Sequence, residues 1–454
     1  VYVGGNMIGV AGLGKSGISA ANLLLKNNEE IMLFDSNKEL SKEEILNKFE
    51  KSCHNKIKIV LGDLKRDALE DISYFVISPG IDLEVEFVKT LKSNNIPIWS
   101  EIELGYKYSK GDLIAITGTN GKTTTTSLVG EIMSNFANSS FTVGNIGIPY
   151  TDIADKTDDS SVTVLETSSF QLETIIDFRP KISAILNITP DHLNRHHTME
   201  NYIKVKEDIS RNQNENDFCV LNYEDTALRK FANEVKAKVV FFSSKRRLDK
   251  GFYLDNDYIK MADKGIVFEI LDTKKLNILG RHNHENVMAA VAIAYSYGVP
   301  MDIIVKTCYD FQAVEHRIEF VKEVNGVKYY NDSKGTNPDA AIQAVRAMPA
   351  NTYVIAGGYD KGSEYDEWIE SFGNKVKKLI LMGATAEKIA ECANRHGFYD
   401  IEIVDSMEEA VNHCAILAKP GEYVLLSPAC ASWGMFKNYE ERGRVFKVCV
   451  RELG

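Results

Sequence analysis

Residues 113–126 read Leu-Ile-Ala-Ile-Thr-Gly-Thr-Asn-Gly-Lys-Thr-Thr-Thr-Thr, an apolar run followed by a glycine turn, a lysine and hydroxyl residues. This order predicts a buried strand, a loop that binds phosphate and the first turn of a helix. Gly118 and Gly121 allow backbone N–H groups to face a polyphosphate, and the helix N-terminus adds a favourable dipole. Lys122 can reach the terminal phosphates, and the Thr123 hydroxyl can bind Mg²⁺.

The loop departs from the strict nucleotide-binding pattern, because Ile116 stands where that pattern has its first glycine. A turn that only caps an ordinary helix is therefore the alternative interpretation. Gly-Lys-Thr directly after a buried strand favours phosphate binding, and we predict an ATP site here.

A second glycine loop lies near the N-terminus, where Gly12, Gly14 and Gly17 match G-x-G-x-x-G after an apolar run. The next predicted strand ends in Asp35, where a dinucleotide-binding fold places its ribose-binding acid. These features alone would indicate an NAD-dependent dehydrogenase, which stays open as an alternative. The loop itself supplies only a backbone cradle for a diphosphate, whichever nucleotide carries it. A later apolar run ends in Ser78-Pro-Gly, at the sheet edge where α/β folds bind ligands.

The length of 454 residues predicts two to four domains, and apolar runs between 216 and 270 indicate a satellite sheet. A net charge of −11 and a pI near 5.5 argue against general binding to nucleic acid or anionic membranes. No apolar run approaches a membrane span and no signal peptide is recognisable, so a cytoplasmic protein is expected. The seven cysteines include no C-x-x-C pair, which predicts reduced thiols and gives no case for a disulfide framework or a zinc site.

Several polar residues beyond the phosphate loop suit nucleotide or metal binding. Glu166 ends the predicted strand 161–165, and a carboxylate there suits Mg²⁺, although it could also only cap a helix. His192 follows another apolar run and could be a metal ligand, a general base or a loop residue. The amides of Asn283 and Asn286 suit the donor and acceptor edge of adenine.

Motifs along the whole chain resemble those of the Mur ligases and their folylpolyglutamate synthase relatives. The matching stretches are Thr117-Gly-Thr-Asn-Gly-Lys-Thr123, Asn187-Ile-Thr-Pro-Asp-His192, Gly280-Arg-His-Asn-His-Glu-Asn286, Glu315-His-Arg-Ile-Glu319, Tyr329-Tyr-Asn-Asp-Ser-Lys-Gly-Thr-Asn-Pro338 and the stretch from Leu425 to Gly443. The resemblance implies an α/β fold of three domains. These are a Rossmann-like domain for the UDP substrate (1–99), a central ATP-binding domain with a mostly parallel, P-loop ATPase-like sheet (100–313) and a Rossmann-like domain for the amino acid (314–454).

The resemblance also implies roles for individual residues. It places around ATP Gly118, Thr119, Asn120, Gly121, Lys122, Thr123, Thr124, Asn283, Asn286, His316, Arg317, Asp332 and Lys334. It places around the UDP substrate Lys15, Ser16, Asp35, Ser36, Ser78, Gly80 and Asn145. It places around the incoming amino acid Thr336, Lys361, Ser432 and Tyr439, the last in place of an expected phenylalanine.

The implied catalytic residues are Lys122, Glu166, His192 and Lys206. Two Mg²⁺ ions are implied, with Thr123, Glu166, His192 and a carbamylated Lys206 as ligands. Around Lys361 the sequence Gly357-Gly-Tyr-Asp-Lys departs from the Gly-Gly-Asp-Gly-Lys form of some members, so only the lysine is carried over.

Within the family, the stretch from Leu425 to Gly443 resembles the branch that adds D-glutamate to UDP-N-acetylmuramoyl-L-alanine in peptidoglycan precursor synthesis. The implied reaction uses ATP to form an acyl phosphate, which the amine of D-glutamate then attacks. The implied partners are small molecules, with no nucleic acid and no membrane, and a monomer is expected.

Three alternatives stay open: another Mur ligase or a folylpolyglutamate synthase-like ligase, the dehydrogenase, and a nucleotide switch without enzyme activity. The dehydrogenase leaves the phosphate loop without a role. The nucleotide switch leaves the first and third domains without one.

Overall fold

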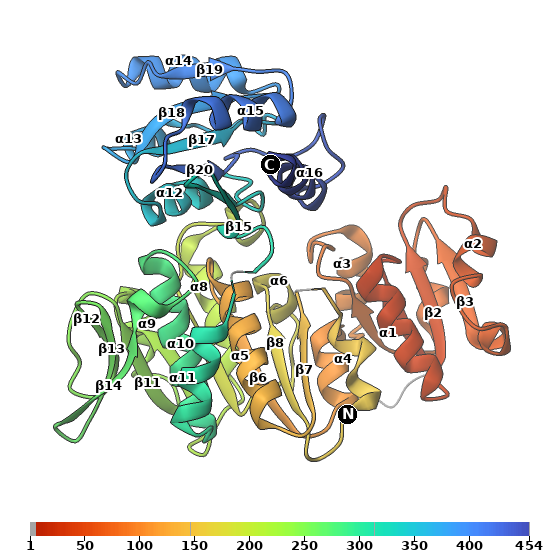
Figure 1. Cartoon of the computed structure of the whole chain (residues 1–454). Helices are drawn as coiled ribbons and strands as arrows, with labels where there is room; N and C mark the ends of the chain where they lie inside the picture. Colours follow the sequence, from red (N-terminus) through yellow and green to blue (C-terminus); the bar gives the residue numbers. More distant parts are fainter. Residues whose placement is uncertain (1–5, 146, 313, 454) are drawn as a thin grey trace. The chain divides into compact units, whose positions relative to one another are not determined.

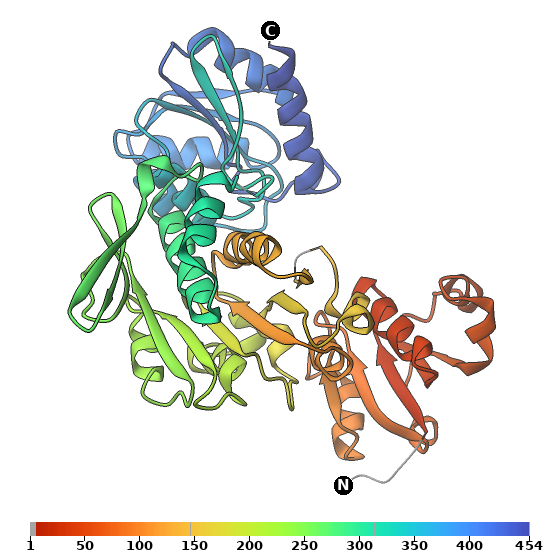
Figure 2. The ribbon, with the colours of Figure 1, turned by 60° about the horizontal axis from the view of Figure 1, so that its bottom comes forward.

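The computed structural model describes residues 6–145, 147–312 and 314–453, and Figures 1 and 2 show its ribbon. Internal contacts divide the chain into two compact units. Unit 1 comprises Val1–Leu271 and Asn286–Thr307, and unit 2 comprises Asp272–Glu285 and Cys308–Gly454. In the described residues the strands form three sheets, of five, nine and six strands.

The five-stranded sheet of unit 1 is parallel throughout and carries the N-terminal glycine loop. The strand order reverses at β1, because the chain first adds β2 and β3 on one side and later adds β4 and β5 on the other. Open α/β sheets bind ligands beside such a reversal, at the carboxyl ends of the strands. The order is β3 (Ile57–Leu61), β2 (Glu30–Asp35), β1 (Met7–Ala11), β4 (Ile72–Ile77) and β5 (Ile98–Ser100). Its helices are α1 (Lys15–Lys26), α2 (Lys42–Leu46) and α3 (Glu86–Ser93).

The nine-stranded sheet of unit 1 carries the phosphate loop after β6 (Figure 1). Neighbouring strands from β7 to β12 pair in parallel, and β12 pairs with β13 antiparallel. The order is β14 (Ile266–Asp272), β13 (Tyr258–Asp263), β12 (Gly251–Asp255), β11 (Lys238–Ser243), β10 (Phe218–Asn222), β9 (Ile182–Ile185), β6 (Asp112–Thr117), β8 (Val162–Glu166) and β7 (Ser140–Gly144).

The prediction of a separate satellite sheet between residues 216 and 270 is wrong. The strands of that region exist, but β10 pairs with β9 and so continues the central sheet. Apolar runs indicate strands without indicating which sheet they join, because pairing partners are set by tertiary packing.

Helices pack on both faces of the nine-stranded sheet (Figures 1 and 2). On one face α5 contacts α10, with the rings of Phe136 and Tyr297 6.2 Å apart. On the other face Leu113 and Ala115 of β6 share a buried core with Tyr202 of α8. Burial on both faces explains why the run before the phosphate loop is apolar without alternation. The helices of this part are α4 (Glu101–Tyr108), α5 (Lys122–Phe136), α6 (Ser169–Leu172), α7 (Leu193–His196), α8 (Met199–Glu207), α9 (Thr226–Phe231), α10 (Arg281–Tyr297) and α11 (Met301–Asp310).

The six-stranded sheet belongs to unit 2. Among the described residues, β15 and β16 pair antiparallel and the other neighbours pair in parallel. Together the three sheets confirm the predicted α/β fold. The order is β15 (Glu319–Val324), β16 (Val327–Asn331), β20 (Tyr423–Leu426), β17 (Thr352–Ala356), β18 (Val376–Leu381) and β19 (Ile401–Ile403). Its helices are α12 (Pro338–Ala347), α13 (Asp366–Glu370), α14 (Ala386–Arg395), α15 (Met407–Leu417) and α16 (Tyr439–Glu452).

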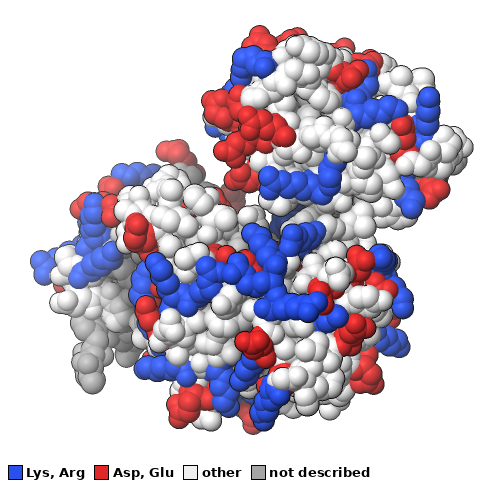
Figure 3. All heavy atoms as spheres, turned by 90° about the vertical axis from the view of Figure 1, so that its left-hand side faces the viewer, with Lys and Arg blue, Asp and Glu red and all other residues white. Residues whose placement is uncertain are grey.

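Within the described ranges, no helix has both the length and the apolar character that a membrane span requires. The face drawn in Figure 3 carries lysine and arginine side chains interspersed with aspartate and glutamate side chains. The chain as a whole contains 64 acidic and 53 basic residues, so the net charge of −11 is a modest excess within a surface of mixed sign.

Glu101, the first residue of α4, provides a test of the packing between the two sheets of unit 1. Burial raises the pKa of this carboxyl from its ordinary 4.5 to about 7, although its Oε1 accepts a 2.8 Å hydrogen bond from Gln171. The folded protein therefore holds this proton more tightly than the unfolded chain, and stability should fall as pH rises from about 4.5 to about 7. We expect Glu101→Gln to flatten this part of the stability profile, measured as thermal unfolding between pH 4.5 and 8.

Glu103 on the same helix is the matched control. Its carboxylate accepts 2.9 Å hydrogen bonds from the backbone N–H groups of Ile176, Asp177 and Phe178. Glu103→Gln should therefore destabilise the protein at neutral pH by about 1–3 kcal/mol. A profile for Glu101→Gln that is as steep as that of the parent would contradict the assignment.

Candidate active site

The phosphate loop connects β6 to α5 as the sequence predicts. Gly121 has φ +84°, a left-handed conformation that favours glycine, and a Cβ there would come within 2.2 Å of Asn286 Oδ1. Lys122 Nζ donates 2.8 Å hydrogen bonds to the carbonyls of Gly118 and Thr119 and so closes the loop. The arrangement leaves the first turn of α5, with the buried hydroxyls of Thr123 and Thr124, at the mouth of the loop.

The phosphate loop also forms hydrogen bonds to the segment that follows β9. Thr119 Oγ1 donates to the carbonyl of Thr189 at 3.1 Å and lies 3.1 Å from the hydroxyl of Tyr202. Asn120 N donates to Asn187 Oδ1 at 2.8 Å. The segment that follows β9, which contains the predicted His192, is therefore anchored directly to the phosphate loop.

Lys206 lies beneath the phosphate loop with only 2% of its surface exposed. Its Nζ donates to the carbonyl of Gly118 at 2.8 Å and lies 4.9 Å from the ring centre of Tyr202. Burial, and secondarily the charge of Lys122, lower the pKa of Lys206 well below its ordinary value. Lys206, which the resemblance implies as a metal ligand, is thus a buried amine whose surroundings favour the neutral form.

Glu166 ends β8 beside the phosphate loop and is 1% exposed. Its Oε1 accepts a 2.8 Å hydrogen bond from Asn145 Nδ2, so two residues that were predicted separately lie together. Within the described part of the chain, its Oε2 is buried without a hydrogen-bond partner. A buried carboxylate oxygen left in this way is costly unless a cation compensates it, which fits a Mg²⁺ ligand.

His192 lies at the start of the short helix α7 with φ +52°, a left-handed conformation that is uncommon for a non-glycine residue. Its Nε2 is 3.4 Å from Asp191 Oδ2, and its ring centre is 4.9 Å from that of Phe170. The side chain is about half exposed, at 49%. It is therefore accessible to a ligand, whereas Lys206 and Glu166 are buried.

Except for Asn145, which lies beside Glu166, the residues predicted for the UDP substrate belong to the five-stranded sheet and its loops, near the strand-order reversal. A pocket of about 730 Å³ is lined by Gly12, Asp35, Ser36 and Gly80, among others. Asp35 shapes its floor, because Oδ2 accepts a hydrogen bond from the N–H of Leu13 at 3.2 Å.

Two further residues of this set support the glycine loop instead of lining that pocket. Ser78 Oγ donates to the carbonyl of Gly12 at 3.1 Å and lies 3.3 Å from Ser16 Oγ. Lys15 lines a separate pocket of about 420 Å³ with Asp152 and hydrogen-bonds the carbonyl of Gly147.

In unit 2, the residues predicted around ATP collect where β16 ends. His316 is buried with φ +67°, and its Nδ1 is 2.9 Å from Asn331 Nδ2. Asp332 Oδ2 accepts a 2.9 Å hydrogen bond from Ser427, and burial raises the pKa of Asp332 to about 7. Lys334 Nζ lies 5.4 Å from the ring centre of Tyr439.

Two other residues of the ATP set have different surroundings. Arg317 is half-buried beside His316, and Asn283 is a buried residue of α10 that donates to the carbonyl of Leu279 at 2.7 Å.

Thr336, Ser432 and Lys361, predicted around the amino acid, lie on loops that leave three neighbouring strands, β16, β20 and β17, and Tyr439 is the first residue of α16. The loop after β17 meets the loop after β20, because Tyr359 N donates to the carbonyl of Ala431 at 2.9 Å. Lys361 Nζ lies 4.8 Å from the ring centre of Trp433, directly after the buried Ser432. Thr336 is half-buried on the loop after β16.

Three family models match consecutive parts of the chain. They are described as the Mur ligase MurD-like N-terminal domain (residues 6–100), the Mur ligase middle domain (116–294) and the Mur ligase glutamate ligase domain (316–430). A curated relative from Lachnoclostridium phytofermentans, named UDP-N-acetylmuramoylalanine--D-glutamate ligase, is 54% identical over 99% of this chain and 98% of its own. This chain belongs to the Mur ligase family. The prediction of an ATP-dependent ligase is therefore confirmed.

Other relatives also match this Mur ligase along nearly its whole length. Proteins of the same name from Lachnospira eligens and Clostridioides difficile are 52% and 47% identical, with at least 98% of each chain covered. The UDP-N-acetylmuramate-alanine ligase of Thermotoga maritima has a TM-score of 0.61 at 19% identity, covering 99% of this chain and 100% of that one. The MurF ligase of the same organism, solved with ADP, has a TM-score of 0.60 at 19% identity, covering 99% and 96%. The two solved structures support the fold.

Sequence reasoning missed Arg195, which joins the two sheets of this Mur ligase. Its guanidinium donates to the carbonyl of Pro79 at 3.1 Å and to that of Ile81 at 2.8 Å, on either side of the pocket residue Gly80. It also pairs with Glu173 and stacks 4.3 Å from the ring centre of Phe170. This arginine belongs to no recognisable motif, and its carbonyl partners are distant in sequence, so no local pattern indicates its role.

We expect Arg195→Ala to weaken binding of the predicted UDP substrate more than binding of ATP, because the substitution releases the turn that lines the larger pocket. The KM for the UDP substrate should rise about 10-fold and that for ATP should change little, consistent with the loss of two charge-assisted hydrogen bonds. Steady-state phosphate release measures both. The matched control is Arg179→Ala: Arg179 pairs with Asp217, just before β10, and its loss should leave both KM values near those of the parent. Equal increases in both values would contradict the role.

Arg442 of this Mur ligase was also missed, although it lies inside the matched C-terminal stretch. It is 1% exposed and donates to the carbonyls of Cys430 (3.0 Å) and Ser333 (2.8 Å), which tie two loops of the candidate site together. The neighbouring Gly443 is required by packing, because a Cβ there would lie 2.2 Å from His316 Nδ1.

Proposed function

We propose that this Mur ligase joins D-glutamate to UDP-N-acetylmuramoyl-L-alanine with the hydrolysis of ATP. The observation that carries the proposal is identity of 54% over 99% of the chain to a relative of that name. The stretch from Ser427 to Gly443 adds support, since it places Trp433, the residue after the buried Ser432, beside Lys361. The cation of Lys361 and the hydroxyls of Ser432 and Thr336 suit a side-chain carboxylate and would leave an ammonium without a partner.

The proposal assigns the three domains predicted from the sequence. Residues 1–99 would hold the UDP substrate, 100–313 ATP and 314–454 the amino acid. The pocket at Asp35 supports the first assignment, because backbone N–H groups of a glycine loop suit the diphosphate and an acid suits the ribose. Lys15, Ser16, Ser36, Ser78, Gly80 and Asn145 complete the proposed UDP-substrate set, and Tyr439 the amino-acid set.

The phosphate loop would hold ATP through residues 118–124, with Asn283, Asn286, His316, Arg317, Asp332 and Lys334 as the other proposed contacts. Thr123 and Glu166 would hold one Mg²⁺, and the lone buried oxygen of Glu166 supports this. His192 and a carbamate on Lys206 would hold a second. When bound, these ions supply positive charge to phosphate and carboxylate oxygens.

The proposed reaction has two steps. A carboxylate oxygen of the UDP substrate bonds to the γ-phosphorus of ATP, and ADP leaves. The amine nitrogen of D-glutamate then bonds to the acyl carbon, its proton is lost and inorganic phosphate leaves. The protein contributes positioning and positive charge, from Lys122 and from the proposed third-domain cations Lys334 and Lys361. We also propose that the enzyme is a monomer and that it acts in the cytoplasm.

Phosphate release from ATP in the presence of UDP-N-acetylmuramoyl-L-alanine tests the proposal. D-Glutamate should support rapid release, whereas L-glutamate and L-lysine should support little. Equal release with L-lysine would overturn the amino-acid assignment. A nicotinamide bound to the purified protein would instead support the dehydrogenase.

A further inference from the structure

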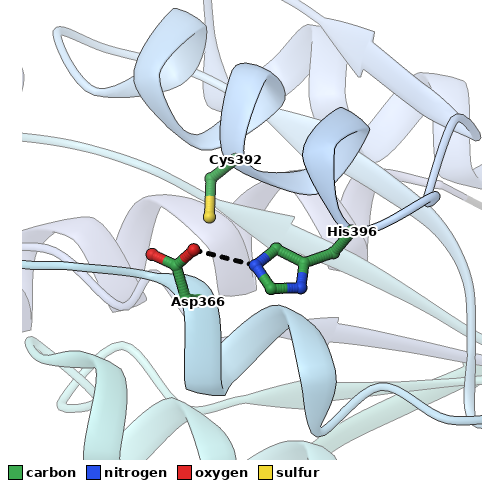
Figure 4. A group of neighbouring side chains, drawn as sticks. All are labelled: Asp366, Cys392 and His396. Atoms are coloured by element: carbon green, nitrogen blue, oxygen red, sulfur yellow. Dashed lines mark hydrogen bonds and ion pairs between the residues drawn. The ribbon is translucent and has the colours of Figure 1, made fainter.

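Asp366, Cys392 and His396 form a compact cluster in unit 2 to which the ligase reaction assigns no role. Asp366 is the first residue of α13, Cys392 lies on α14, and His396 is the residue that follows the last turn of α14, four positions after the cysteine. Figure 4 shows the three side chains pointing toward one another from the two helices. One donor atom from each residue lies within 4.8 Å of the other two.

The donor set matches what a zinc-type cation binds. Zinc takes thiolate, imidazole and carboxylate ligands, and donor atoms already within 4.8 Å need only small side-chain rotations to share one ion. His396 Nε2 is 2.8 Å from Asp366 Oδ1, so this nitrogen faces the centre of the cluster. Cys392 is buried at 2% exposure, whereas a quarter of the His396 side chain is exposed, which leaves an approach from solvent.

The other ring nitrogen of the histidine has a carboxylate within ion-pair distance. His396 Nδ1 lies 3.6 Å from Glu370 Oε1 at the end of α13. A carboxylate on the second nitrogen orients the ring and fixes which nitrogen binds the ion.

The local charge also favours a cation. The carboxylates of Asp366, Glu370 and Glu364 act on this cluster, against the guanidinium of Arg395, which lies 3.5 Å from Asp366 Oδ1. Arg395 is exposed on the helix surface, with 60% of its side chain accessible, so it can move away when an ion takes its place.

We propose that Asp366, Cys392 and His396 bind one Zn²⁺-type cation, with water in the fourth position and Glu370 supporting the histidine. No sequence motif indicates this site, because its cysteine has no C-x-x-C partner and its carboxylate comes from another helix. The ion would cross-link α13 to α14. The proposal does not depend on the ligase reaction, because these residues lie outside the sets assigned to ATP, the UDP substrate and D-glutamate.

Titration of the metal-free full-length chain with Co²⁺ alone tests the site. Cobalt bound to a thiolate gives a near-ultraviolet charge-transfer band, which the proposed magnesium sites cannot produce because they contain no thiolate. One equivalent of Co²⁺ should develop the band, and Zn²⁺ should abolish it by competition. The absence of a thiolate band in the parent chain would overturn the proposal.

Substitutions of the proposed ligands test whether the cobalt–thiolate band comes from these residues. Cys392→Ser should remove it, His396→Gln should weaken binding, and Glu370→Gln should weaken cobalt binding by about 10-fold, as expected for a residue that orients a ligand. The matched controls are Cys449→Ser, a partly exposed cysteine on α16, and His413→Gln, a surface histidine paired with Glu402. Both should keep the band. Thermal unfolding shows whether each variant is folded, and a band that persists in folded Cys392→Ser would overturn the assignment.

Discussion

Replacement of Lys206 by alanine is expected to reduce ligase turnover by about 100- to 1,000-fold, and added acetate or formate should restore part of it. Lys206 is buried under the phosphate loop within 2.8 Å of the Gly118 carbonyl, near the charge of Lys122. Both burial and that charge favour a neutral amine, which is the form that reacts with CO₂. The resulting carbamate is an anion with oxygen donors, the kind of ligand that Mg²⁺ prefers.

The rescue separates this role from a purely structural one. A small carboxylate can enter the space left by the side chain and replace the missing anion, but it cannot replace an ammonium. Lys204, exposed on the same helix, is the control, and Lys204→Ala should keep turnover near that of the parent. Mass measurement of the intact protein under CO₂ should detect the added carbamate. Full activity of Lys206→Ala would show that the residue was assigned wrongly.

The sequence predicted the elements of this fold better than their connections. The phosphate loop, the N-terminal glycine loop and the strands around them were predicted because they depend on local patterns, apolar runs bounded by glycine turns. The satellite sheet was wrong because the pairing of β10 with β9 depends on residues nearly forty positions apart.

In the candidate site too, residues within local motifs were predicted, whereas residues whose partners are distant in sequence were missed. Glu166 and Asp35 were predicted because each ends a strand, and Lys122 because it follows a strand and a glycine turn in a recognisable motif. Arg195 and Arg442 were missed because their partners are backbone carbonyls, which leave no signal in a sequence. The Asp366 cluster was missed for a related reason, since two helices each contribute part of a site that neither contains alone.

Glu166→Gln is expected to reduce turnover by about 100-fold or more while leaving the magnesium-free protein at least as stable as the parent. The amide oxygen can still accept the hydrogen bond from Asn145, which preserves the local packing. The charge on the buried Oε2, which has no partner in the described residues, is removed. An unpaired buried charge costs stability, so its removal should stabilise the protein in the absence of metal.

These opposite effects distinguish a metal ligand from a residue that only caps a helix, because loss of a cap would lower stability. Phosphate release measured over a range of Mg²⁺ concentrations should show a higher magnesium requirement for Glu166→Gln, and thermal unfolding without metal should show no loss. Glu101→Gln is the matched control, since Glu101 is also a buried glutamate with one oxygen lacking a partner among the described residues. Glu101 carries a pKa of about 7 and lies at the start of α4 instead of beside the phosphate loop, so this variant should keep its magnesium requirement. A parental magnesium requirement in Glu166→Gln, or a clear loss of stability, would place the carboxylate in the framework of the fold and leave Mg²⁺ to other ligands.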